Sequence, residues 1–251
     1  MKTAVVTGSS SGIGEATARR LDADGYALLL VARRADRLEQ LAGELTDAHV
    51  LALDVTADDA PERVLEAAQS RWDRLDLLVN NAGSAWRAGF GDEKGGYRNV
   101  RETMELNFFA PVRLTEALLP LLRRSAPSAI VNVSSISGRI ALPKSGAYTA
   151  SKFALTGWSD SLGQEEARNG VHVAVVLPGF VSTEGFPHQG LRSRRLTRWT
   201  VSTPEKVARA IVKAAERRRA EVPVPRAWGL VPRLRAIAPG LWRRVTGGMR
   251  R

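Results

Sequence analysis

Tyr148 and Lys152 are two proton-handling residues four positions apart in the stretch YTASK. Residues at this spacing share one face of an α-helix, so a helix here would hold the phenol and the ammonium side by side. A free phenol has a pKa of about 10, but a neighbouring ammonium favours the phenolate and lowers that pKa. The pair is therefore a candidate general acid–base. Taken alone, the spacing is more often that of an exposed helix pair.

A glycine-rich segment, TGSSSGIG, follows the first apolar run of the chain and precedes a helix-like segment. Backbone N–H groups bind phosphate when they come close to it, and glycine removes the side chains that would block this approach. We expect Gly8 to make a tight turn, Gly12 to let the backbone approach a ligand, and Gly14 to let helix and strand pack closely. The segment predicts a nucleotide site, although glycine-rich turns also close ordinary strand–helix links.

Apolar runs alternate with helix-like segments around these residues. The runs are near-continuous in Val, Leu and Ile, which is typical of parallel strands buried on both faces. Repeated βα units indicate an α/β fold with a doubly wound parallel sheet of the Rossmann type. Strands are predicted at 3–8, 26–33, 49–55, 75–83, 128–135, 172–179 and 220–225, and helices at 13–25, 34–45, 60–72, 97–122 and 148–169.

The joint pattern of these motifs resembles the short-chain dehydrogenase/reductase family. The glycine spacing is Thr-Gly-x-x-x-Gly-x-Gly, and NNAG follows the fourth predicted strand. Ser135 precedes Tyr148 by 13 residues, as in the family. Asn107 in LNFFAP also matches, and so does PGFVST, residues 178–183, which corresponds to the family's loop beside the nicotinamide of the cofactor. The resemblance covers roughly residues 3–216 and is specific because the motifs occur together in order.

The resemblance implies a catalytic set of Asn107, Ser135, Tyr148 and Lys152. Tyr148 would act as general acid or base, and Lys152 would also bind the cofactor ribose. Ser135 would hydrogen-bond the substrate oxygen where negative charge develops, although Ser134 beside it is an equal candidate from position alone. Asn107 would hold a water that relays protons to solvent.

The implied cofactor is a nicotinamide dinucleotide. An acidic residue at the end of the second strand would select NAD, but Ala32 stands there and Arg33 and Arg34 follow. Because a guanidinium binds the 2′-phosphate, we predict NADP(H), with Arg33 as the main contact; NAD(H) remains the alternative. Ser11 occupies a position that is basic in many NADP-dependent relatives. The predicted contacts are Gly8, Ser10, Ser11, Gly12, Ile13, Gly14, Arg33, Arg34, Asp54, Val55, Asn81, Ala82, Gly83, Tyr148, Lys152, Pro178, Gly179, Val181 and Thr183.

The segment 183–202 lies where the family places its substrate lid, and it is basic. One hypothesis is that its arginines recognise an acidic carrier or a phosphate-bearing thioester; a solvated basic loop is at least as good an explanation. Aromatic residues near it would suit an apolar substrate body. The arginines are Arg192, Arg194, Arg195 and Arg198, and the aromatic residues are Phe180, Phe186 and Trp199.

Residues 217–251 form a distinctive C-terminal tail after a main domain of residues 1–216. The tail holds ten arginines and one glutamate, so it carries +9 of the net charge of +11. Pro232 and Pro239 are each suited to start a short helix. Arginine mixed with Trp and Leu is typical of an interfacial membrane anchor. The alternatives are packing over the substrate pocket or a dimer mate and, least favoured, nucleic-acid binding. The apolar tail residues are Trp228, Leu230, Val231, Leu234, Ile237, Leu241 and Trp242.

Composition limits the remaining classes of function. The chain has 251 residues, no cysteine and three scattered histidines, so we expect no disulfide and no metal site. It has neither an apolar run of membrane-spanning length nor a signal-peptide core, which favours a cytoplasmic protein. We predict an NADP(H)-dependent oxidoreductase for a mostly apolar carbonyl or alcohol, and a homo-oligomer by resemblance. A 3-oxoacyl-thioester reductase and a non-catalytic redox sensor are the alternatives.

Overall fold

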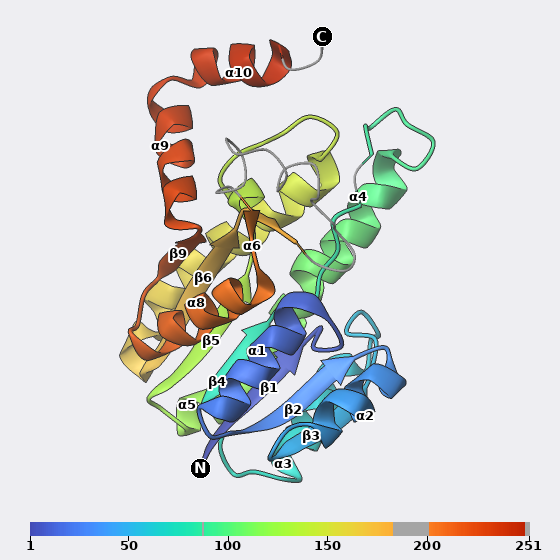
Figure 1. Ribbon diagram of the computed structural model, residues 1–251, viewed down its shortest axis with the longest axis vertical. Helices are drawn as coiled ribbons and strands as arrows, with labels where there is room; N and C mark the ends of the chain where they lie inside the picture. The colour runs from blue at the N-terminus through green and yellow to red at the C-terminus, as the bar shows by residue number, and fades with distance from the viewer. Residues whose placement is uncertain (87, 183–200, 249–251) are drawn as a thin grey trace.

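A parallel sheet runs through the centre of the computed structural model, which describes residues 1–86, 88–182 and 201–248 (Figure 1). Among these residues the sheet has seven strands in the order β3-β2-β1-β4-β5-β6-β9, and every pairing is parallel. The strands are β1 (Lys2–Thr7), β2 (Tyr26–Ala32), β3 (Ala48–Ala52), β4 (Leu77–Asn80), β5 (Ser128–Val133), β6 (Val171–Pro178) and β9 (Glu221–Val224).

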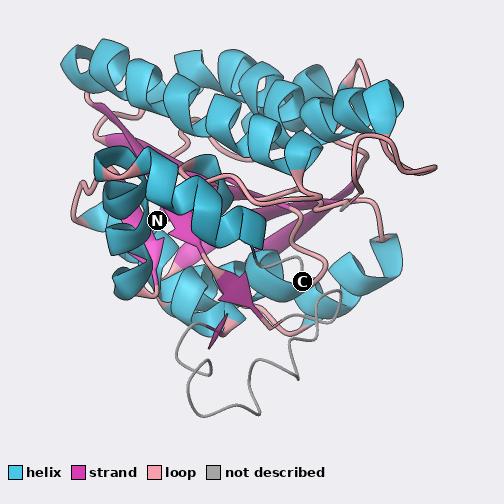
Figure 2. Cartoon of the chain, turned by 90° about the horizontal axis from the view of Figure 1, so that it is seen from above, coloured by secondary structure: helices cyan, strands magenta, loops and turns pink. Residues whose placement is uncertain are grey.

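Helices cover both faces of the sheet (Figure 2). Successive side chains of a strand point to opposite faces, so Leu28 and Leu30 of β2 enter one core while Leu29 and Val31 enter the other. One core is closed by α1 (Gly12–Ala23), α2 (Ala35–Gly43) and α8 (Pro204–Glu216), and the other by α3 (Ala60–Gln69), α5 (Ala110–Arg124) and α6 (Gly146–Glu166).

The doubly wound parallel sheet predicted from the sequence is confirmed. All seven residues of β2 are buried, as expected for a strand covered on both faces. From β1 the chain winds outward to β2 and β3, and then returns to β4 on the other side of β1. The strand order reverses at β1 and β4, and ligands of such sheets bind at the carboxyl ends of the strands beside this reversal.

The helix predicted at 97–122 is a continuous helical run, but it is not a uniform α-helix. α4 (Gly96–Met104) is joined to α5 through a π-helical turn at Glu105–Phe109. Such a turn adds one residue to the helical repeat and often lies at a functional site. The apolar spacing of the sequence does not reveal it, because the segment on either side remains helical. Asn107, at the centre of the turn, is fully buried.

The last predicted strand is confirmed as β9, which pairs with β6 at the edge of the sheet. A 3₁₀ turn at Arg226–Gly229 then leads into α9 (Leu230–Ile237) and α10 (Pro239–Gly248). Pro239 starts α10 as predicted, whereas Pro232 is the third residue of α9 rather than its first. Both helices extend beyond the carboxyl edge of the sheet (Figure 1). No helix among the described residues is long and apolar enough to cross a bilayer.

Leu29 of β2 has no exposed surface, so Leu29→Ala is expected to destabilise the protein by about 3 kcal/mol through lost burial and a cavity. Leu234→Ala, at a side chain that is 63% exposed, is the matched control and should change stability by less than about 0.5 kcal/mol. Urea unfolding followed by circular dichroism measures both; equal losses would contradict the assigned core.

Candidate active site

The predicted site residues from distant parts of the chain meet at the carboxyl edge of the sheet. The glycine loop follows β1, Asn81 follows β4, Ser135 lies just beyond β5, and Pro178 ends β6. Parallel strands bring these ends together on one edge because their directions are the same. α6 passes the same edge and carries Tyr148 and Lys152.

The glycine loop has the backbone geometry of a phosphate cradle. Gly8 and Gly12 have φ values of +68° and +59°, which favour glycine. A Cβ on Gly8 would lie 2.9 Å from the Cα of Ala82, and a Cβ on Gly14 would overlap the carbonyl oxygen of Gly8. The loop leads directly into the N-terminus of α1, where N–H groups without helical partners favour anions. These residues therefore fit a dinucleotide's phosphates.

Thr7 and Asn81 fix this cradle to the neighbouring strand. The Thr7 hydroxyl accepts hydrogen bonds from the N–H groups of Asn81 and Ala82, each at 3.0 Å. The Asn81 amide donates to the carbonyl oxygen of Thr7 at 2.9 Å. Asn81 was predicted only as one of the cofactor contacts, and no role was predicted for Thr7. Thr7 is the first residue of TGSSSGIG, but these partners lie in the segment after β4, more than seventy residues further along the chain.

Lys152 is buried, with 4% of its surface exposed, and its Nζ donates a hydrogen bond to the carbonyl oxygen of Val133 at 2.9 Å. The same Nζ lies 5.9 Å from the centre of the Tyr148 ring, so α6 holds the two side chains together as its spacing predicts. Removal from water disfavours the charged form. This burial lowers the pKa of the Lys152 ammonium to about 8. The Tyr148 ring thus lies close to a buried ammonium whose pKa is lowered by its surroundings.

The two adjacent serines have different environments. Ser134 Oγ lies 2.8 Å from Thr156 Oγ1 and donates to the Lys152 carbonyl oxygen, so its hydroxyl binds the helix that packs on it. Ser135 Oγ accepts from Ser137 N at 3.1 Å and lies 3.4 Å from the carbonyl oxygen of Pro178. Ser135 is therefore the serine at the loop that was predicted to adjoin the nicotinamide.

Asn107 connects the π-helical turn to two other parts of the site. Its amide nitrogen donates to the carbonyl oxygen of Ser84 at 2.9 Å and to Ser151 Oγ at 3.0 Å. Its amide oxygen accepts from Ser84 N at 2.9 Å. Ser151 neighbours Lys152 on α6. Asn107 thus joins the segment after NNAG to the helix that carries the Tyr148–Lys152 pair.

The two arginines after β2 lie in different places. Arg34 donates hydrogen bonds to Ser11 Oγ at 2.7 Å and to Ser10 Oγ at 3.0 Å, directly over the glycine loop. Arg33 lies 3.8 Å from an Asp54 oxygen. Burial favours a higher pKa for Asp54, but hydrogen bonds from Thr56 and the charge of Arg33 bring that pKa below its ordinary value.

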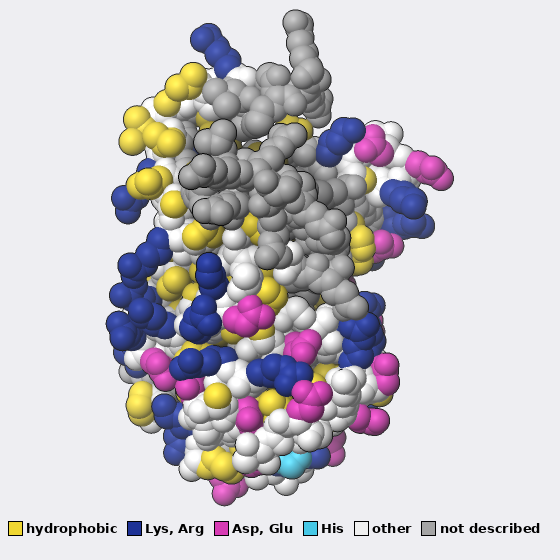
Figure 3. All heavy atoms as spheres, viewed as in Figure 1, with side chains coloured by type: hydrophobic (Ala, Val, Ile, Leu, Met, Phe, Trp, Pro, Cys, Tyr) yellow, Lys and Arg dark blue, Asp and Glu magenta, His cyan; other side chains and the backbone are white. Residues whose placement is uncertain are grey.

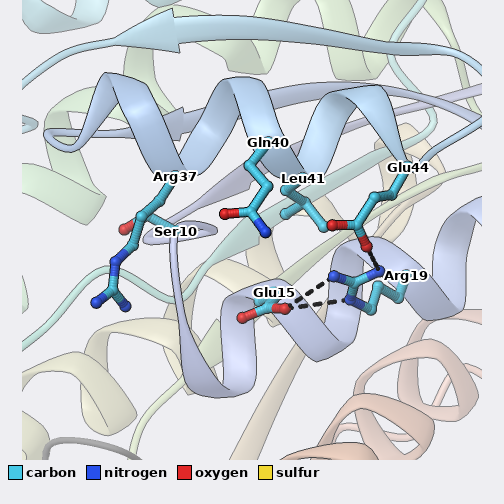
Figure 4. Close-up of a pocket in the computed structure, with 7 residues that line it drawn as sticks. All are labelled: Ser10, Glu15, Arg19, Arg37, Gln40, Leu41 and Glu44. Atoms are coloured by element: carbon cyan, nitrogen blue, oxygen red, sulfur yellow. Dashed lines mark hydrogen bonds and ion pairs between the residues drawn. The ribbon is translucent and has the colours of Figure 1, made fainter.

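A cavity of about 340 Å³ opens between α1 and α2 beside Ser10 (Figure 4). Arg37 points along its mouth, whereas Arg19 is held by Glu15 at 3.1 Å and by Glu44 at 2.8 Å. Arg37 therefore lies beside Ser10 at one end of the cavity, while Arg19 is paired with two carboxylates at the other end.

The remaining predicted contacts lie at the same edge or outside the described residues. Ile13 and Gly12 open α1, Val55 is buried, and Val181 is buried in the short strand β7 (Phe180–Val181). β7 pairs with β8 (Val201–Ser202). Thr183 and the segment 183–200, with the arginines and aromatic residues predicted to meet substrate there, lie outside the described residues.

Trp228 of the tail is a further residue at this edge. Its ring packs edge-on against Phe180, with centroids 5.7 Å apart, and a Cβ on Gly179 would overlap the indole nitrogen. From the sequence, Trp228 was predicted only as one of the apolar residues of the tail. The contact arises because β9 pairs with β6 and returns the chain to the end of that strand.

Comparison with known proteins agrees with this geometry. Residues 2–191 match the short chain dehydrogenase family. The chain is 33% identical to "Dehydrogenase/reductase SDR family member 7B" of Bos taurus, over 96% of this chain and 79% of that protein. It is 36% identical to "Hydroxysteroid 11-beta-dehydrogenase 1-like protein A" of Xenopus laevis, over 96% of this chain and 84% of that protein.

Solved structures agree as well. A short-chain dehydrogenase from Streptomyces avermitilis superposes with a TM-score of 0.80 at 32% identity, covering 98% of this chain and 97% of that one. A short-chain dehydrogenase/reductase from Caenorhabditis elegans, solved with cofactor, has a TM-score of 0.80 at 28% identity and covers 90% of this chain and 95% of that one. The chain belongs to the short-chain dehydrogenase/reductase family. It is an NAD(P)-dependent oxidoreductase that acts on CH–OH or C=O groups.

Gly14→Ala is expected to abolish nucleotide binding, because its Cβ would overlap the Gly8 carbonyl oxygen and displace the cradle. Gly157→Ala is the matched control: it is a helical glycine of α6 with open space around it, and it should stabilise the protein by about 0.5–1 kcal/mol. Quenching of intrinsic fluorescence by NADPH measures the binding. Normal binding by the Gly14 variant would contradict the cradle.

Lys152→Met is expected to change the pH dependence of stability. The folded-state pKa of about 8 lies below the ordinary value of 10.5, so between these pH values the unfolded chain binds more protons than the folded one. Wild-type stability therefore gains a favourable contribution as pH rises through this window. The variant lacks it, so its stability relative to wild type should fall by about 3 kcal/mol from pH 8 to pH 10.5. Unfolding in urea across this range tests the sign; a constant difference would contradict it.

Proposed function

We propose that this protein is an NADP(H)-dependent carbonyl reductase or alcohol dehydrogenase for a mostly apolar substrate. The observation that carries the proposal is the buried Lys152 ammonium beside the Tyr148 ring, at the edge of the sheet where the glycine cradle ends. A proton-handling pair and a phosphate cradle on one edge suit transfer of a hydride coupled to transfer of a proton.

The residues of the chain have distinct roles in this proposal. A nicotinamide bound at the cradle would supply or accept the hydride. In the reductive direction Tyr148 donates a proton to the substrate oxygen, and Lys152 favours the phenolate that remains. Ser135 donates a hydrogen bond to the oxygen as negative charge develops on it. Asn107 positions the turn beside Ser151 and holds the water through which Tyr148 regains its proton.

Preference for NADP(H) is supported by the positions of the arginines after β2. Arg34 already lies on Ser10 and Ser11, and a 2′-phosphate beside those hydroxyls would meet its guanidinium. Arg33 would contribute a second positive charge and is 75% exposed. A carboxylate at Ala32 would repel that phosphate, and its absence removes the usual basis for selecting NAD.

An apolar substrate is supported by the aromatic contact of Phe180 with Trp228 beside the predicted nicotinamide loop. The name of the Xenopus laevis relative, "Hydroxysteroid 11-beta-dehydrogenase 1-like protein A", points to the same substrate class. The proposal includes a cytoplasmic homo-oligomer, as many family members form, with peripheral contact to lipid through the tail. The arginines that suggested a thioester substrate belong to residues 183–200, which lie outside the described residues.

The first test is titration with NADPH and NADH, followed by NADPH oxidation against a panel of ketones, aldehydes and 3-oxoacyl thioesters. We expect tighter binding of NADPH, turnover of apolar ketones, and loss of turnover in Tyr148→Phe with nucleotide binding retained. Comparable activity with NADH would contradict the cofactor preference. Preferred turnover of thioesters would favour the acyl reductase instead.

Arg34→Gln is expected to weaken NADPH binding by about tenfold to a hundredfold, since a hydrogen bond to a charged group contributes about 1.5–3 kcal/mol. NADH binding should change by less than about threefold, because NADH lacks the 2′-phosphate partner. Arg63→Gln, at an exposed arginine of α3, is the control. Equal loss of both nucleotides would show that Arg34 supports the loop rather than the phosphate.

A further inference from the structure

We propose that the edge of the molecule formed by α8, β9 and α9 is a docking surface for an anionic lipid bilayer. The inference rests on the peripheral lipid contact of the proposed function and names the surface and the lipid charge it requires. It does not depend on the cofactor or on the reaction. Two features, an outward apolar stripe and a basic groove, carry the inference from different parts of the chain.

The apolar stripe lies on α9. Leu230, Leu234 and Ile237 are 58%, 63% and 83% exposed, and their spacing places them along one face of the helix. Helices of globular proteins usually turn such a stripe toward the core. Exposed large apolar side chains that gather on one surface mark sites of interaction with a membrane or a protein.

The contacts of Arg235 show that α9 packs against the protein with a charged side chain instead of its apolar face. The Arg235 guanidinium donates a hydrogen bond to the carbonyl oxygen of Arg139 at 2.7 Å and lies 5.3 Å from the centre of the Phe153 ring. The helix therefore turns a charged side chain toward the protein and its leucines toward the surroundings. Leu241 of α10, 64% exposed, extends the apolar surface, and Figure 3 shows hydrophobic side chains gathered over these two helices.

The basic groove lies next to this stripe, between α1, α8 and the end of β9, with a volume of about 490 Å³. One carboxylate, Glu216, lines it among many cations, and Figure 3 shows dark blue side chains concentrated on this side of the molecule. The charges are crowded: Arg217 first, and then burial and the charges of Arg219 and Arg226, lower the pKa of Lys213. The cationic lining residues are Arg20, Lys206, Arg209, Lys213, Arg217, Arg219 and Arg226.

The two features form one surface. Arg226 of the groove begins the turn that leads directly into Leu230 of the stripe, four residues further on. An interfacial membrane site combines two kinds of side chain. Apolar side chains enter the boundary between headgroups and acyl chains, and neighbouring cations attract the anionic lipids. The surface also reaches the active site, because Trp228, between these residues, packs against Phe180. An apolar substrate in the bilayer would thus lie near the loop after β6.

A bilayer fits this surface better than the other occupants do. In a two-fold dimer the same patch meets itself, so a groove lined by seven cations and one carboxylate would face its own copy and repel it. A nucleic acid would bind the cations, but its backbone offers no partner for Leu234 and Ile237. Anionic lipid satisfies both the charges and the apolar stripe.

The test is flotation of the full chain with vesicles of phosphatidylcholine, with and without phosphatidylglycerol, at low and high salt. We expect flotation only with phosphatidylglycerol and weakening by salt. The groove variant Lys213→Gln/Arg217→Gln/Arg226→Gln should bind these vesicles roughly a hundredfold more weakly, since each basic residue near an anionic surface contributes about fivefold. The stripe variant Leu234→Gln/Ile237→Gln should lose more than about tenfold.

The control Lys94→Gln/Arg98→Gln/Arg124→Gln removes the same charge from exposed positions near α4 and at the end of α5, and should float like wild type. Thermal melts check that all variants are folded. Equal losses of vesicle binding in the control and groove variants would mean that only net charge matters, and would overturn the docking surface. Vesicle binding that neither the groove variant nor the stripe variant weakens would overturn it too. If wild type does not float, binding to a DNA column and the molar mass in solution identify another occupant. DNA binding that the docking variants lose would assign the surface to nucleic acid, and a dimer that the docking variants lose would assign it to a second copy.

Turnover of a water-soluble carbonyl without vesicles separates this inference from the proposed reductase. Turnover without flotation would overturn the docking surface alone. Flotation without any nucleotide-dependent turnover would support docking and count against the reductase.

Discussion

The structure around the site depends on one constraint, the cost of keeping the Lys152 ammonium away from water. A buried cation is tolerated where hydrogen-bond acceptors are fixed around it, and the carbonyl oxygen of Val133 is such an acceptor, supplied by the end of β5. That carbonyl is available only because β5 stops there while α6 crosses at close range. The close packing in turn needs a glycine at 138, where a Cβ would overlap Thr156.

The same edge is stiffened by polar contacts between segments far apart in the chain. Thr7 ties the cradle to the segment after β4, and Asn107 ties that segment to α6. Asn80 and Asn132 continue this pattern inside the sheet, joined at 2.8 Å between neighbouring strands. Buried networks of this kind hold side chains in fixed positions, which proton and hydride transfer require. The tail differs, since α9 exposes the side chains that a core would hide.

Much of the fold could be predicted from residue order. The apolar runs of β1, β2 and β6 identify buried parallel strands, and the spacing of Tyr148 and Lys152 predicts their shared helix face. The π-helical turn at Asn107 was not predictable, because one extra residue per turn leaves the apolar pattern on both sides intact. The sequence prediction named Arg33 as the main contact of the 2′-phosphate, but it could not foresee that Arg34 is the arginine on the glycine loop, since adjacent residues after a strand point in different directions set by the turn.

Residue order alone was enough to identify the family, the doubly wound sheet and the helix face shared by Tyr148 and Lys152, because motif order and apolar spacing can be read along the chain. Tertiary structure alone decided which serine faces the active-site loop, which arginine covers the cradle, and that Trp228 reaches Phe180. It also decided that α9 turns Arg235 inward and Leu234 outward. These outcomes depend on partners from distant strands and helices, and local spacing contains no information about how such elements approach one another.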